Sequence, residues 1–78
     1  MALSRQLSPP NATDIVVRLQ WATDRMWDLA EGVLDPPVAG LLWSIVVGWA
    51  DLCDLDERRQ YLTIASQLET MMASFRGE

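Results

Sequence analysis

Few side chains in this sequence could do chemistry, and most of those are carboxylates. The chain of 78 residues has 11 acidic residues, six arginines, no lysine, no histidine and a single cysteine, Cys53. Histidine is the side chain that most often transfers protons in catalysis. No base stands beside Cys53, and the adjacent Asp54 should raise the pKa of its thiol rather than lower it. We therefore predict that the protein is not an enzyme.

The nearest approach to a metal-binding pattern is a pair of aspartates, Asp24 and Asp28. Residues four apart lie on the same face of a helix, and paired carboxylates can hold a divalent cation. The same spacing is typical of a solvated helix face, which is the interpretation we favour. The glycines form no phosphate-binding loop. The sequence therefore predicts no metal site and no cofactor.

The charge distribution opposes the binding of nucleic acids. The formal net charge is −5, and the arginines are scattered over positions 5, 18, 25, 58, 59 and 76. A nucleic-acid-binding surface needs basic residues that are concentrated on one face. We therefore expect no nucleic-acid partner.

The stretch 36–50 is the most informative part of the chain, because it carries no charge and is apolar on every side. A helix of this kind must be buried all round, and a chain of 78 residues has few elements that could surround it. Domains of this size bury only about 60% of their unfolded surface and are marginally stable alone. A single cysteine forms no internal disulfide, so self-association is the remaining means of stabilisation. We expect a homodimer that buries this central helix.

The apolar stretch is too short to favour a membrane span. About 20 apolar residues are needed to cross a bilayer, and this run is bounded by Asp35 and Asp51. The first residues of the chain lack the apolar core that is typical of a signal peptide. We expect a cytoplasmic protein without a membrane partner.

The hydrophobic pattern predicts an all-α protein, in which a three-helix, bundle-like protomer follows an extended N-terminal arm. The arm covers residues 1–12, where two consecutive prolines oppose helix formation. Residues 13–76 form a single helical domain. Its helices are predicted at about 13–34, 36–52 and 54–75. For the first of them, Asn11 or Thr13 is the expected N-cap, with Asp14 in the first turn.

The sequence leaves two alternatives for the connection between the second and third helices. No glycine or proline separates Trp49 from Arg76, so the two could be one continuous rod. Such a rod of about 40 residues would span about 60 Å and could hardly fold back on itself. We favour a break near Cys53 and Asp54, because aspartate is a weak helix former and a strong cap.

Small residues recur every four positions in the central helix, at Gly40, Ser44 and Gly48. Small residues at this spacing let two helix backbones approach closely. We expect this side of the helix to meet a second copy of the chain. The predicted dimer interface consists of Gly40, Trp43, Ser44, Val47, Gly48 and Trp49. The alternative is that the first or third helix of the same chain packs there.

Of the four tryptophans, Trp27, Trp43 and Trp49 are expected in the core or the dimer contact. By helical phase, Trp21 instead lies away from the apolar stripe of its helix, among charged residues. Tryptophan and arginine are enriched at binding hot spots. The predicted partner-binding surface consists of Val17, Arg18, Trp21, Arg25 and Asp28. The alternatives are that Trp21 packs over its neighbouring arginines, or that it lies inside the dimer.

These features favour a small non-enzymatic regulator or inhibitor that acts by helix-mediated protein–protein interaction, with itself and with a larger protein. Small bacterial or phage anti-defence proteins and anti-activators have this general character. The absence of lysine suggests codon bias in a GC-rich bacterial or phage genome. The alternative is a helical sensor for an apolar or aromatic small molecule, with a pocket lined by Trp43, Trp49, Met71 and Met72. A small membrane-active protein is a third alternative.

Overall fold

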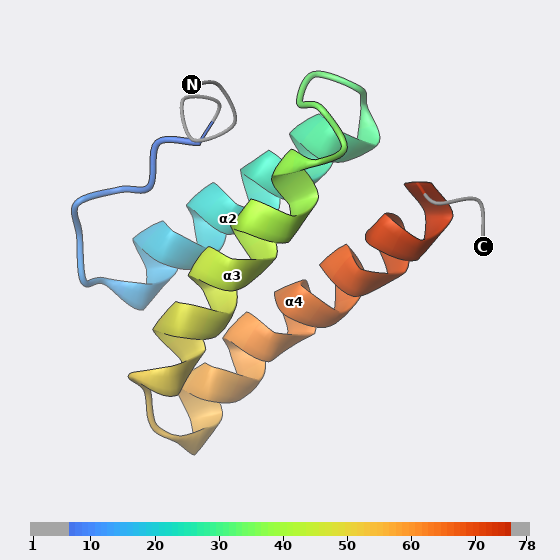
Figure 1. Cartoon of the computed structure of the whole chain (residues 1–78). Coiled ribbons are helices and arrows are strands. Elements are labelled where there is room, and N and C mark those ends of the chain that lie inside the picture. Colours follow the sequence, from blue (N-terminus) through green and yellow to red (C-terminus); the bar gives the residue numbers. More distant parts are fainter. Residues whose placement is uncertain (1–6, 76–78) are drawn as a thin grey trace.

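The computed structural model describes residues 7–75, in which three helices follow one another. They are α2 (Ile15–Ala30), α3 (Val38–Asp51) and α4 (Leu55–Phe75). Consecutive helices run in opposite directions, and α3 packs against both of the others (Figure 1). The predicted all-α class is confirmed for the described residues. Residues 1–6 of the predicted arm and residue 76 of the predicted helical domain lie outside them.

The helix α2 begins two residues later than the predicted boundary at Thr13. Its N-cap is Asp14, whose Oδ1 accepts a hydrogen bond from the backbone N–H of Val16 at 2.9 Å. An N-cap side chain must reach an N–H group two or three residues further along the chain. Asp14 makes this bond, so the expectation that Asn11 or Thr13 caps the helix is wrong.

The helix α2 ends at Ala30 rather than at residue 34, because Gly32 stops it. Gly32 has φ = 80°, a left-handed conformation that residues with a Cβ atom avoid. Its N–H donates to the carbonyl of Leu29 at 3.3 Å, and the N–H of Val33 donates to the carbonyl of Asp28 at 2.8 Å. These two hydrogen bonds form a Schellman motif, which ends the helix.

The helix α3 begins at Val38, two residues after the predicted boundary. The two prolines before it lie in a turn, in which the N–H of Val38 donates to the carbonyl of Asp35 at 2.9 Å. The N–H of Ala39 donates to the carbonyl of Pro36 at 3.0 Å. Proline has no N–H to donate, so it suits a position before the first helical hydrogen bonds.

The predicted break between the second and third helices is confirmed. The helix α3 ends at Asp51, and α4 begins at Leu55. Asp54 caps α4, because its Oδ1 accepts a hydrogen bond from the N–H of Glu57 at 3.1 Å. Asp56 and Glu57 both lie in the first turn of α4, where negative charge interacts favourably with the helix dipole.

The hydrophobic core is built around one side of α3, with α2 and α4 packed against that side. Five buried residues recur along α3 at helical spacing. The buried core residues are Leu7, Ala22, Leu29, Leu34, Val38, Ala39, Leu42, Val46, Ala50, Tyr61, Ile64, Ala65 and Leu68. Leu7 precedes the helices and is only 4% exposed. Its segment is also tied to α2, because Nε of Arg18 donates to the carbonyl of Ala12 at 2.8 Å.

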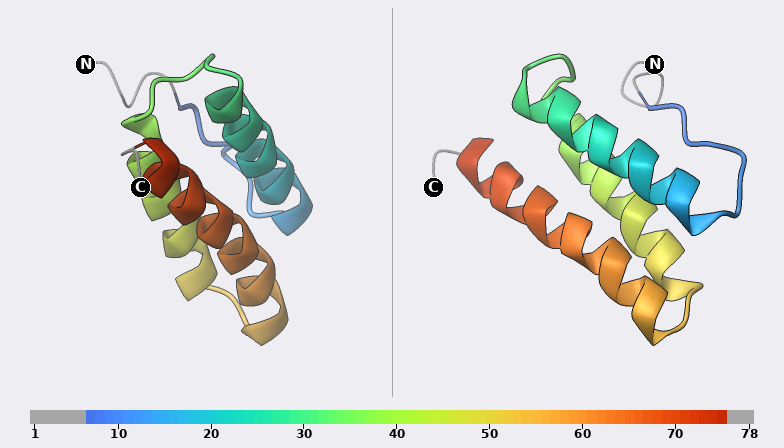
Figure 2. Two further views of the ribbon diagram at one scale, coloured as in Figure 1. Left: turned by 90° about the vertical axis from the view of Figure 1, so that its right-hand side faces the viewer. Right: turned by 180° about the vertical axis from the view of Figure 1, so that it is seen from behind.

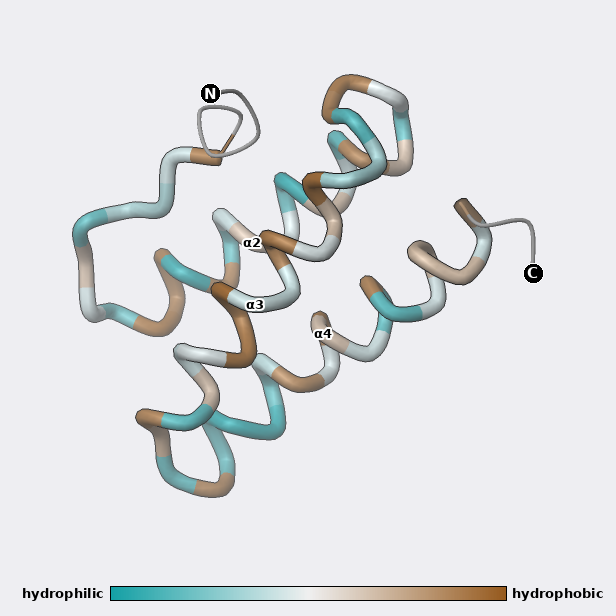
Figure 3. The backbone as a smooth tube through the Cα atoms, in the orientation of Figure 1, coloured by the Kyte–Doolittle hydropathy of each residue, from teal (hydrophilic) through white to brown (hydrophobic). Residues whose placement is uncertain are grey.

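Within one protomer, α3 is not buried on all sides. Ser44 and Gly48 are exposed and Gly40 is half-buried. Figure 2 shows α2 and α4 on neighbouring sides of α3, which leaves its outer side uncovered. Apolar and neutral residues alternate along α3 in Figure 3, with no charge before Asp51. The open side of α3 is therefore an uncharged surface, which we call the outer face of α3.

Candidate functional site

Three aromatic rings and one guanidinium join α2, α3 and α4. The rings of Trp21 and Trp49 meet edge to face, with centroids 5.5 Å apart and planes at 71°. Trp49 also contacts Tyr61 of α4 at 5.9 Å between centroids. The Cζ atom of Arg18 lies 4.9 Å from the centroid of the Trp49 ring, a distance at which a cation is attracted to the ring face. Trp49 is thus the central member of this aromatic cluster.

The expectation that Trp21 points away from the core is wrong. Its ring is partly buried and packs against the core beside Trp49. Nε1 of Trp21 is buried and has no hydrogen-bond partner among the described residues. Arg18 stacks on Trp49 and not on Trp21. The helix α2 is turned so that the flank carrying Trp21 faces α3.

The predicted partner-binding residues come together only in part. A hollow with a volume of about 480 Å³ is lined by Pro10, Val16, Val17, Gln20, Trp21, Asp24 and Arg25. It gathers Val17, Trp21 and Arg25. Arg18 is directed at Trp49 instead, and Asp28 forms an ion pair with Arg25 at 2.9 Å. That this hollow binds a partner stays a prediction.

The predicted dimer residues divide between two sides of α3. Trp49 belongs to the aromatic cluster, and Nε1 of Trp43 donates to Oε2 of Glu69 on α4 at 3.0 Å. Val47 is half-buried. The small residues lie on the outer face, where a Cβ atom added to Gly40 or Gly48 would meet no described atom within 4 Å. Neither α2 nor α4 therefore packs closely on these glycines.

Trp27, which was expected in the core or the dimer contact, is 60% exposed. It lies at the edge of a hollow of about 240 Å³ between α2 and α4. We call this hollow the α2–α4 groove, and it is lined by Met26, Trp27, Ala30, Gln67 and Met71. A second hollow, of about 350 Å³, lies between the start of α3 and the end of α4. It is lined by Pro36, Pro37, Gly40, Met72 and Phe75. Sequence reasoning missed both, because each is assembled from two helices.

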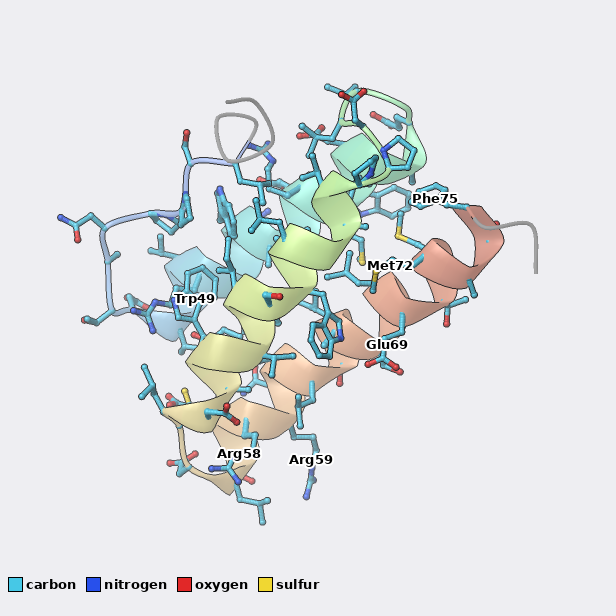
Figure 4. All side chains as sticks on the ribbon, in the orientation of Figure 1. Trp49, Arg58, Arg59, Glu69, Met72 and Phe75 are labelled. Carbon is cyan, nitrogen blue, oxygen red and sulfur yellow. The ribbon has the colours of Figure 1, made fainter. Side chains whose placement is uncertain are left out.

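The four residues expected to line a small-molecule pocket are not brought together. Met71 lines the α2–α4 groove, whereas Met72 lines the hollow beside Pro36. Trp49 is packed between other rings, and Trp43 is hydrogen-bonded to Glu69. Figure 4 shows Trp49 and Met72 well apart in the fold.

The aspartates considered for a cation have other partners. Oδ1 of Asp24 accepts a hydrogen bond from Nε2 of Gln20 at 3.0 Å, and Asp28 is paired with Arg25. Among residues 7–75, no three side chains of the metal-binding types histidine, cysteine, aspartate and glutamate are grouped to hold an ion.

Tyr61 of the aromatic cluster and Cys53, which lies beside the cluster, have raised pKa values. Burial, followed by the negative charge of Glu57, raises the pKa of the Cys53 thiol above its ordinary value of 9.0. Sγ of Cys53 donates to the carbonyl of Trp49 at 3.2 Å. Burial also raises the pKa of Tyr61 above 10.0, although a hydrogen bond from Arg18 acts in the opposite direction. The acidic neighbours of Cys53 do raise its pKa, as predicted, but burial is the larger cause.

These two raised pKa values predict that the protein loses stability in alkaline solution. The folded state holds both protons more tightly than the unfolded chain does, so unfolding releases protons between the ordinary and the raised pKa. The free energy of unfolding should therefore fall as the pH rises above 9.0 for Cys53 and above 10.0 for Tyr61. Urea unfolding over an alkaline pH series measures this fall. Cys53→Ala and Tyr61→Phe should each make it shallower, and an unchanged slope in the double variant would contradict the assignment.

The chain matches no protein-family model, and neither its sequence nor its structure has a significant match among curated proteins and solved structures. No helix among residues 7–75 has the length and apolar character needed to cross a membrane. The surfaces described above are therefore the basis for assigning a function.

Proposed function

We propose that this chain is a small, non-enzymatic, cytoplasmic regulator or inhibitor of bacterial or phage origin that acts by helix-mediated protein–protein interaction. It associates with a second copy of itself and binds a larger protein. The observation that carries the proposal is the outer face of α3. This face is uncharged from Val38 to Ala50, and a Cβ atom added at Gly40 or Gly48 would meet no other element of residues 7–75 within 4 Å.

The outer face of α3 is suited to contact with an identical helix. The hydroxyl of Ser44 donates to the carbonyl of Gly40 at 3.1 Å in the same helix, so burial of Ser44 leaves no donor unpaired. The glycines let a second backbone approach closely. The absence of charge matters because each protomer has a formal net charge of −5. Two copies can meet here without bringing like charges together, in a two-fold contact of the kind most homodimers use.

Exposed apolar side chains outside this face favour a further protein partner. Exposed apolar residues that gather in one place commonly mark interaction sites, as Val16 and Val17 do at the hollow beside Trp21. The exposed large apolar residues are Val16, Val17, Trp27, Val33, Leu52, Leu55, Leu62 and Phe75. The small-molecule alternative gains less support, because its four expected residues lie in different parts of the fold.

The self-association is tested by light scattering coupled to size-exclusion chromatography, with Gly48→Leu and Gly48→Ala as matched variants. We expect a dimer for the natural chain and for Gly48→Ala. Gly48→Leu should weaken dimerisation by at least about tenfold, because a large side chain keeps the two helices apart. Its helix content should not change, since no other part of residues 7–75 lies within 4 Å of a Cβ atom at this position. A natural chain that is monomeric, or a Gly48→Leu variant that dimerises normally, would contradict the proposal.

A further inference from the structure

We propose that α4 carries a second self-association surface, on which α4 of another copy of the chain packs antiparallel about a two-fold axis. This contact is separate from the outer face of α3, so it joins dimers into larger assemblies. The proposed function needs only the α3 contact, and the α4 contact goes beyond it. The observations that support it are the exposed side chains of α4 and the order of their sizes and charges.

The side of α4 that is turned away from its buried residues is open and partly apolar. Leu55 and Leu62 lie on this side, and both are exposed. Together with Arg58, Arg59 and Ser66 they line a hollow of about 510 Å³, whose lining residues all belong to α4. No other helix of residues 7–75 therefore takes part in this hollow. We call this side the outer face of α4.

Six positions on the outer face of α4 recur with alternating spacings of four and three residues. They are Leu55, Arg59, Leu62, Ser66, Glu69 and Ala73. This is the spacing of the seam along which two helices of a coiled coil meet. The seam is not apolar throughout, so its complementarity depends on which residues lie opposite each other.

The sizes of the seam residues are complementary in an antiparallel pair. With the two-fold axis midway between Leu62 and Ser66, each of these residues lies opposite the other one on the partner helix. Leu55 then lies opposite Ala73 in the same way. Each leucine meets a small side chain, and facing positions that alternate large and small residues interdigitate without voids.

The charges of the seam are complementary about the same axis, because Arg59 lies opposite Glu69 of the partner copy. Arg59 is exposed, and its guanidinium has no partner among residues 7–75. Arg58, by contrast, donates to backbone carbonyls near the end of α3. Oε2 of Glu69 accepts a hydrogen bond from Nε1 of Trp43 at 3.0 Å, which orients the carboxylate and leaves its second oxygen for another donor. Figure 4 shows Arg59 and Glu69 along the same edge of α4.

The antiparallel arrangement is the one that these charges favour. A parallel pair would place Arg59 opposite the same residue of the partner, and Glu69 likewise, so that like charges meet. The antiparallel pair forms two arginine–carboxylate contacts, which suit the planar guanidinium. Asp56 and Arg58 flank the seam, and in this register both lie opposite uncharged residues. Two chains with a net charge of −5 each can therefore meet here without repulsion between neighbouring side chains.

The test is sedimentation equilibrium of the full chain carrying Gly48→Leu, in which the α3 contact is expected to be lost. We expect this chain to dimerise through α4 as its concentration rises. Adding Arg59→Glu or Glu69→Arg should weaken this association by at least about tenfold, because each substitution creates two contacts between like charges. In the natural chain, the α4 contact should appear as a mass that grows beyond that of the dimer.

Exchange of the two charges separates a specific contact from a general effect of charge. A mixture of the Arg59→Glu chain with the Glu69→Arg chain should associate again, because each copy supplies the charge that the other lacks. The double variant Arg59→Glu/Glu69→Arg should also associate, since both ion pairs are preserved. The matched control is Glu31→Arg, an exposed residue outside α4 that changes the net charge as Glu69→Arg does. It should alter the affinity less than about twofold.

Three results would overturn the α4 contact. They are a Gly48→Leu chain that stays monomeric at every concentration, single charge variants that associate as strongly as their parent, and a mixture of the two that does not associate. The proposed function is read separately, from the mass of the natural chain and of Gly48→Leu at low concentration. A natural dimer that is lost in Gly48→Leu and never grows further would leave the proposed function standing. A dimer that is lost only in Arg59→Glu would remove the α3 contact and leave the α4 contact.

Discussion

Replacing Trp49, whose side chain is half-buried, with alanine is expected to lower the free energy of unfolding by about 3 kcal/mol, the lower end of the range for aromatic residues in a core. The Trp49 ring contacts the rings of Trp21 and Tyr61, and the Arg18 guanidinium lies over it. Its loss would therefore weaken the packing of all three helices at once. Small domains have stabilities toward the lower end of about 5–15 kcal/mol, so the variant should be only marginally stable. Urea unfolding followed by far-ultraviolet circular dichroism measures the change.

One control variant and one double-mutant cycle test whether Trp49 stabilises the protomer through its contacts with the other rings. Trp27→Ala removes a tryptophan that is 60% exposed and should change stability by at most about 1 kcal/mol. A double-mutant cycle of Trp49→Phe with Trp21→Ala should show a coupling of about 0.5–1.5 kcal/mol, because the two rings meet edge to face. The contrary result is a Trp49→Ala variant that is as stable as the natural chain but monomeric. It would place Trp49 in the dimer contact, as the sequence predicts, and not in the protomer core.

Leu42→Ala should lower the free energy of unfolding by about 2–5 kcal/mol. Leu42 is 0% exposed and lies in the middle of the buried stripe of α3, between Val38 and Val46. Truncation would leave a cavity at the contact of α3 with its neighbours, which a close-packed interior refills only in part. The same urea unfolding measurement gives the effect.

The matched control for Leu42 is Leu52→Ala, the same substitution at the end of the same helix. Leu52 is 81% exposed, so its truncation should change stability by less than about 0.5 kcal/mol. Equal effects at the two positions would show that the outer surface near Leu52 is buried in solution, for example in a dimer. The dimer contact would then contribute to the stability of the protein as much as the core of the protomer does.

Much of the fold was predictable because local chemistry sets it. The break before α4 follows from the capping side chain of Asp54, and the two prolines before α3 separate it from α2. The predicted length of α2 was too great, although the sequence contains a residue that indicates the end of the helix. Gly32 lies just after the last turn and takes the left-handed conformation that ends many helices. A glycine near a helix end carried more information than the apolar residues beyond it.

The site was less predictable, as Trp21 and Trp27 show. They are six residues apart, so at about 100° per residue they lie on opposite flanks of the apolar stripe of α2. Trp21, expected to point away from the core, is packed against Trp49, and Trp27 is largely exposed in the protomer rather than part of its core. A modest rotation of α2 about its axis buries one flank and uncovers the other. The direction of that rotation depends on how α2 meets α3 and α4.

The sequence by itself determined the all-α class, the order of the helices, the break between α3 and α4 and the absence of charge from Val38 to Ala50 in α3. These properties come from helix periodicity, capping and charge, which act over a few neighbouring residues. The tertiary structure alone decided which side of α3 stays open, which tryptophan joins the core and where α2 and α4 form a groove. Those features depend on the rotation and docking of whole helices, and helical phase measured along one segment carries no information about its neighbours.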